Sequence, residues 1–176
     1  LGAGMLWYTQ GDLDRARSRL TLARAVGTGD MEIVAHTENI LGHVEHAAGH
    51  MQAARDCFAR SNDGFRALGI PWGTGHTLTA MAWVALESGD IGQAEGLLNE
   101  ATSELRHAGP WFLSLMRDLR ALVAVRRGHP DEAPAAGERV AGTLPGRDAL
   151  PLDVSLVGGR RCHDGDGCGA DGPGSG

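Results

Sequence analysis

The sequence predicts an all-α fold built from antiparallel helix hairpins that repeat along the chain. Apolar residues recur at intervals of three and four, which places them on one face of each expected helix. Four turn glycines are spaced by 38, 40 and 39 residues, namely Gly11, Gly49, Gly89 and Gly128. An alanine stands five residues after each of them, at Ala16, Ala54, Ala94 and Ala133. A constant offset of this kind indicates a repeated supersecondary unit.

The helices expected from this pattern follow one another closely. They cover residues 1–10, residues from 13 up to the glycines at 27 and 29, 31–48 and 51–68. A helix with Pro71 near its start and with residues 77–88 in it comes next, followed by residues from 91 up to the break at 109–110, and by 111–127. Glycine suits the left-handed residue that closes a helix, and aspartate suits the N-cap of the next one. Gly11-Asp12 and Gly89-Asp90 provide both signals in adjacent positions, Asp30 can cap another helix, and Pro71 suits a first helical position.

Leu41–Ser61, LGHVEHAAGHMQAARDCFARS, contains the clearest copy of the unit. Leu41-Gly42 lies in its first helix, and Ala54 and Phe58 lie in the second. We expect the alanine where the two helices approach most closely, and the large residue in the gap toward the next hairpin. The large position holds Leu20, Phe58 and Leu98 in turn, but it is Gly137 in the fourth copy, where the pattern fails.

These residues resemble the tetratricopeptide repeat, best in 41–61, well in 3–23 and 81–101, and partly in 120–133. The resemblance implies a right-handed superhelix of seven to eight helices over residues 1–133. Its repeats would be 1–29, 30–70, 71–109 and a partial 110–133. The long period and the phrase RALGIPWGTGHTLTAMAWVALESGDIGQAEGLLNEA also resemble the C-terminal repeats of large bacterial LuxR-type transcriptional regulators and cyclase-like signalling ATPases.

The resemblance implies a protein–protein interaction scaffold or sensor, as a fragment of such a regulator or ATPase. The alternative is a regulatory domain that binds a small effector in the concave groove. Tetratricopeptide hairpins line that groove with the first helix of each pair. By resemblance the groove positions are Tyr8, His36, Asn39, His43, His46, His76, Thr79, Trp83, Glu87, Asp118 and Arg126.

The histidine-rich group at 36, 39, 43 and 46 shares a helix face independently of any family, because its spacings are three, four and three. Three interpretations remain open: a polar groove for a peptide or effector, a solvated face whose histidines reflect composition, and a metal-binding or pH-sensitive cluster. No fourth ligand of fixed geometry accompanies the histidines, so we predict no metal.

Composition excludes several function classes. The net charge of −6 argues against contact with nucleic acid, which needs clustered basic residues. No apolar run is long enough to span a bilayer, and three cysteines are too few for a disulfide framework, so we expect a cytoplasmic protein. No phosphate-binding loop or catalytic constellation stands out, so no cofactor and no enzymatic activity are predicted. Uncapped repeat ends suggest self-association.

After Ala133 the sequence changes character. Pro134 falls inside the expected eighth helix, and residues 134–176 are rich in glycine and proline and lack aromatic side chains. We expect this tail to be mostly disordered. It is either a natural linker or the product of a reading-frame change. Cys162, His163 and Cys168 are too far apart among glycines to suggest a metal site.

Overall fold

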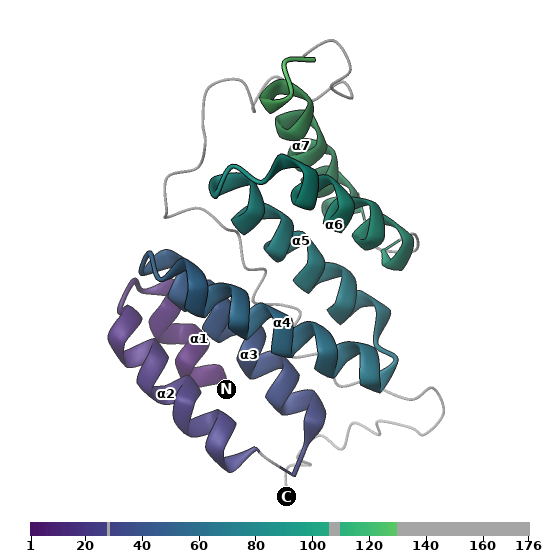
Figure 1. Ribbon diagram of the computed structural model, residues 1–176. Helices are drawn as coiled ribbons and strands as arrows, with labels where there is room; N and C mark the ends of the chain where they lie inside the picture. The colour runs from purple at the N-terminus through teal and green to yellow at the C-terminus, as the bar shows by residue number, and fades with distance from the viewer. Residues whose placement is uncertain (28, 106–109, 130–176) are drawn as a thin grey trace, which may run out of the picture.

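The computed structural model describes residues 1–27, 29–105 and 110–129, with the backbone alone at 110–114 (Figure 1). Every regular element in these ranges is an α-helix, which confirms the all-α class. The helices are α1 (Gly2–Thr9), α2 (Leu13–Val26), α3 (Met31–Ala47), α4 (Met51–Leu68), α5 (Pro71–Glu87), α6 (Ile91–Glu104) and α7 (Pro110–Arg126). None of the described helices has both the length and the apolar character needed to cross a bilayer.

The predicted turn glycines are confirmed, and they end α1, α3, α5 and α7 in the same way. At Gly49 the N–H group donates to the carbonyl of His46 at 2.9 Å, and the next N–H, of His50, donates to Glu45 at 2.8 Å. The same pair of bonds recurs at the other three turns. All four glycines have φ between 79° and 81°, a left-handed conformation that is costly for residues with a Cβ atom.

The predicted aspartate caps and the position of Pro71 are confirmed as well, and α5 begins at Pro71 itself and not at residue 77. The carboxylates of Asp12, Asp30 and Asp90 each accept a hydrogen bond from a backbone N–H in the first turn of the following helix. Pro71 occupies the first position of α5, where its missing N–H group costs nothing. Local chemistry therefore fixes where each hairpin begins and turns.

Within each hairpin the two helices approach closely at a very small residue. A Cβ atom at Gly42 of α3 would lie 2.5 Å from the ring of Phe58 on α4. Gly4 of α1 has the same relation to Leu20 of α2, again at 2.5 Å. The large residue therefore packs against its own hairpin. Phe58 also fills the gap toward the next hairpin, as expected, because Ala80 and Val84 of α5 belong to the same cluster.

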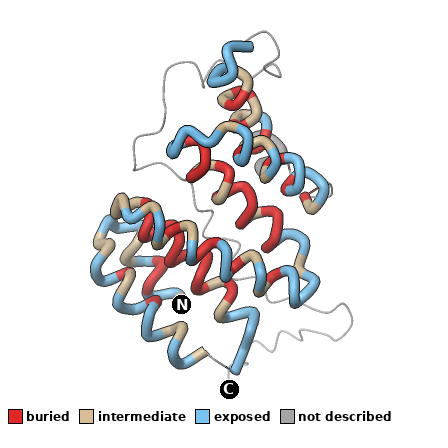
Figure 2. The backbone as a smooth tube through the Cα atoms, viewed as in Figure 1, coloured by how far each residue is buried: buried red, intermediate tan, exposed pale blue. Residues whose placement is uncertain are grey.

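The hairpins α1–α2, α3–α4 and α5–α6 follow one another, with α7 after them (Figure 1). Each second helix contacts the first helix of the next hairpin, and the first helices α3 and α5, and α5 and α7, also touch. Buried residues are densest along α3 and α5, which pack against hairpins before and after them (Figure 2). The right-handed superhelical sense stays a prediction.

A polar bridge joins consecutive hairpins at the same place. It starts from the residue six positions after the turn glycine and ends near the C-terminus of the next first helix. Arg17 donates to Glu45 at 2.6 Å, Arg55 donates to Ser88 at 2.5 Å, and Arg127 donates to Glu95 at 3.0 Å. The repeat therefore extends to the contacts between its copies.

Residues 130–176 lie outside the described ranges. The second helix of the fourth repeat, the position of Ala133, the break at Pro134 and the disordered tail remain predictions.

Candidate functional site

The predicted groove residues all lie on first helices, and those of α3 and α5 come together. Asn39, His43 and His46 of α3 face His76, Thr77 and Glu87 of α5, and we call these six residues the α3–α5 seam. Tyr8 on α1 and Asp118 and Arg126 on α7 are not part of it. The structure therefore joins the groove candidates of the second and third hairpins.

The burial of the seam is inconsistent with a solvated face, which was one of the three interpretations of the histidine-rich group. His43 is 3% exposed, Asn39 5% and His46 7%, and Thr79 of α5 is buried as well. These side chains are covered because α3 packs against both α4 and α5. Trp83 is half-buried, and Glu87 keeps more of its surface open.

His43 is enclosed by aromatic rings. Phe58 of α4 meets it edge-on, with ring centroids 5.0 Å apart, and His76 lies 5.9 Å away across the seam. Both ring nitrogens of His43 are buried without a hydrogen-bond partner. Burial, followed by the nearby His76 and His46, holds the pKa of His43 well below its ordinary value of 6.5. The ring is therefore a neutral packing element at neutral pH.

His46 connects the two helices through a carboxylate. Its Nε2 lies 2.6 Å from one oxygen of Glu87, and the other Glu87 oxygen accepts from Trp83 Nε1 at 3.1 Å. Both oxygens of Glu87 are thus engaged. This arrangement holds the half-buried indole of Trp83 in one orientation at the edge of the seam.

Asn39 forms the second polar connection. Its amide donates to the hydroxyl of Thr77 at 3.0 Å, and that hydroxyl lies 3.3 Å from the hydroxyl of Ser61 on α4. Thr77 in turn donates to the carbonyl of Gly73 at 2.8 Å. The chain of bonds satisfies buried polar groups from three helices, which favours one relative placement of α3, α4 and α5.

His36 and His76 lie toward the other end of the seam. His36 packs against Phe65 at 4.9 Å and Trp72 at 5.3 Å between ring centroids. Burial lowers the pKa of His36, although Glu32 opposes the shift. Burial, with a contribution from His36, lowers the pKa of His76 to about 4. Neither ring is poised to be a cation near pH 7.

The remaining predicted residues are separate from the seam. Tyr8 packs against the core of the first two hairpins, and burial raises its pKa. Asp118 is half-buried on α7, and Arg126 at its end is exposed. A binding surface that used all the predicted residues would have to extend over three hairpins and α7.

Among the described residues, no three His, Cys, Asp or Glu side chains converge in a way that could hold a metal ion. Burial raises the pKa of Cys57 to about 11, so its thiol is unreactive at neutral pH. Cys162, His163 and Cys168 lie outside the described residues.

Comparisons of the chain with family models, with curated proteins and with solved structures find no match. The site is therefore interpreted from its own geometry.

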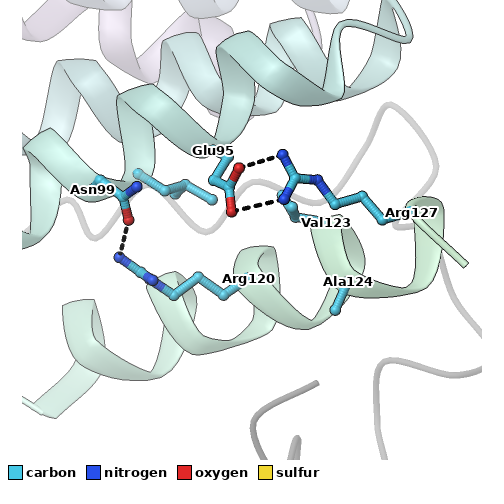
Figure 3. A pocket seen from close by; sticks show the side chains of 7 residues that line it. Glu95, Asn99, Arg120, Val123, Ala124 and Arg127 are labelled. Atoms are coloured by element: carbon cyan, nitrogen blue, oxygen red, sulfur yellow. Dashed lines mark hydrogen bonds and ion pairs between the residues drawn. The ribbon is translucent and has the colours of Figure 1, made fainter. Parts of the chain in front are cut away.

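Sequence reasoning missed a cleft between α6 and α7. It encloses about 330 Å³ and is lined by Glu95, Leu98, Asn99, Arg120, Val123, Ala124 and Arg127 (Figure 3). Arg127 is paired with Glu95, whereas the partners of Arg120 among the described residues are the neutral oxygens of Asn99 and Thr102, at 2.8 and 2.9 Å. The sequence contained one indication of the polar rim. Glu95 stands six residues after its turn glycine, at the same offset as Arg17 and Arg55 from theirs.

Proposed function

We propose that the chain is a protein–protein interaction module that acts as a scaffold or sensor in a bacterial signalling protein. The observation that carries the proposal is the contact between α3 and α5, which covers most of the groove candidates of two hairpins and leaves Trp83 and Glu87 at its open edge. Arrays of helical repeats use extended surfaces of this kind to bind partners. For this function we predict no catalytic residue, no cofactor and no metal.

The partner would be a protein or a peptide segment that contacts the exposed edge of the seam. Trp83 supplies an aromatic anchor there, and Glu87 a carboxylate next to it. Tryptophan is enriched among the residues that dominate binding energy at interfaces. The buried Asn39, His43 and His46 would not touch the partner but would fix the positions of the exposed groups, which lowers the ordering cost of binding.

The test compares two tryptophans. The full chain would be exposed to extract of its source bacterium, and bound proteins would be quantified by mass spectrometry. Trp83→Ala, which replaces the half-buried tryptophan, should lower the amount of the specific bound partner tenfold or more. The control, Trp72→Ala, changes a partly exposed tryptophan outside the seam and should retain it. Equal loss in both variants, with both folded by circular dichroism, would contradict the proposal.

The wider setting rests on the resemblance to LuxR-type regulators and signalling ATPases. We place the module in the cytoplasm, without membrane insertion and without direct contact with nucleic acid. Self-association through uncapped repeat ends is part of the same proposal. Sedimentation velocity over a hundredfold range of concentration should then show a rising average mass, whereas a constant monomer mass would remove self-association.

Small-effector binding is the second proposal, and the cleft between α6 and α7 favours it. Arg120 has no carboxylate among its described partners, so an anionic molecule would find a positive charge there. A thermal-shift screen with citrate and succinate should raise the melting temperature of the wild type and of Arg117→Gln, but not of Arg120→Gln. Arg117 is an exposed arginine on the same helix that does not line the cleft.

A further inference from the structure

The α3–α5 seam places two titratable rings on opposite sides of a joint between hairpins. His43 belongs to the second hairpin and His76 to the third, with 5.9 Å between their ring centroids. A charge on either ring would be buried next to the other. The joint therefore buries His43 without a hydrogen-bond partner, although imidazole is a group that accepts a proton in mild acid.

Within the part of the chain that the structure describes, no anion is available to stabilise a protonated His43. On its own helix the nearest titratable group facing it is His46, and from α5 it faces His76. From α4 it meets the apolar ring of Phe58. Glu87 already uses both oxygens for His46 and Trp83. Burial of a cation without a partner is strongly unfavourable.

The other carboxylates of α3 point elsewhere. At 100° per residue, Glu38 and Glu45 lie about 140° and 160° around the helix from His43. Glu45 binds Arg17 of α2, and Glu38 binds Arg24 of α2 and Arg60 of α4. They are thus held by arginines on the far side of α3 and cannot neutralise the seam.

We infer that the α3–α5 seam is an acid-sensitive joint, at which protonation of His43, next to His76, opens the contact between α3 and α5. At neutral pH the bonds from Asn39 to Thr77 and from His46 to Glu87 hold the joint closed. Because α4 also packs against α5, opening of the seam weakens the junction between the second and third hairpins and leaves the hairpins themselves folded. The inference concerns conformation and does not depend on the proposed partner.

The direction of the pH effect follows from proton linkage. Both rings have pKa values below the ordinary 6.5 in the closed joint, chiefly because of burial, and exposure to water in the open joint would return them toward that value. The closed form is therefore fully favoured above the ordinary histidine value of about 6.5 and is lost as the pH falls toward 4. Over this window, each histidine multiplies the open-to-closed ratio by up to about tenfold per pH unit.

Hydrogen exchange of the full chain at pH 6.8 and pH 5.0, corrected for intrinsic rates, tests the joint. We expect protection to fall at the seam residues of α3 and α5 while the other residues of the α3–α4 and α5–α6 hairpins stay protected. His43→Leu, which copies the leucine found at this position in α7, should lower the pH response by about tenfold per pH unit. His129→Gln, at an exposed histidine beyond α7, should leave it unchanged.

Two results would overturn the inference. One is simultaneous loss of protection in all helices at pH 5.0, which would indicate global unfolding. The other is an unchanged pH response in His43→Leu. If that variant does not fold, an NMR titration of the wild-type histidines decides the question, because His43 and His76 must titrate well below 6.5. Ordinary midpoints for both would refute the joint.

Discussion

Gly42 shows how strictly a single residue can be specified in this chain. Its backbone lies against the ring of Phe58, which is itself almost completely buried. The ring also meets His43 of α3 and packs with Ala80 and Val84 of α5, so it has little room to move away. A methyl group at this position would therefore displace a packed aromatic side chain instead of a flexible one.

Gly42→Ala should lower the free energy of unfolding by about 1–3 kcal/mol, the usual cost of overpacking a core. The matched control is Gly96→Ala, because a Cβ atom at Gly96 meets nothing within 4 Å. On the exposed side of α6 that change should stabilise the protein by about 0.5–1 kcal/mol through helix propensity. Urea unfolding of both variants measures the difference, and equal effects of the same sign would contradict the close contact.

At the scale of a helix, Glu38 connects three elements. It lies on α3, its side chain is only 4% exposed, and it accepts from Arg24 of α2 at 3.2 Å and from Arg60 of α4 at 2.9 Å. Hydrogen bonds to a charged group are stronger than neutral ones. The carboxylate thus helps to hold the first hairpin against the second.

Glu38→Gln removes the charge but keeps the shape, and should destabilise the protein by about 1–3 kcal/mol. Glu32→Gln, at an exposed glutamate on the same helix, should change stability by less than about 0.5 kcal/mol. Thermal and urea unfolding provide both values. A neutral result for Glu38→Gln would mean that the arginines are held by other contacts.

The helices and turns could be predicted from the sequence because the residues that determine them act locally. Turn glycines, aspartate caps and Pro71 act within a few residues of their position, and each is confirmed. The burial of His43 could not be predicted in this way. Spacing shows which residues share a face of a helix, but not which neighbouring hairpin covers that face. The cleft between α6 and α7 could not be predicted for the same reason.

Across the whole molecule, different joints contain different chemistry. The contact between α2 and α3 relies on Glu45, whose pKa is lowered chiefly by its hydrogen bond from Arg17. A carboxylate with a lowered pKa stabilises the fold above its ordinary value of 4.5, and this contribution is lost as the pH falls below it. The seam between α3 and α5 depends instead on the neutral ring of His43, whose pKa is lowered chiefly by burial.

The two joints should therefore respond to acid in sequence. At pH 5.5 the seam should already be weakened, while the contact between α2 and α3 should still be intact. Site-resolved hydrogen exchange during a stepwise acid titration from pH 7 to pH 3.5 measures the order. Glu45→Gln should weaken the α2–α3 contact at every pH. Simultaneous opening of both joints in the wild type would contradict this assignment.

The polar bridges between hairpins favour one order of the hairpins along the array. At the first junction the earlier hairpin contributes the cation, Arg17, and the later one the anion, Glu45. At the third junction the signs are reversed, with Glu95 preceding Arg127. If the third hairpin were moved in front of the second, Glu95 would face Glu45, and if the first preceded α7, Arg17 would face Arg127. Recombination that shuffled these units would thus meet electrostatic repulsion, although every turn would still fit.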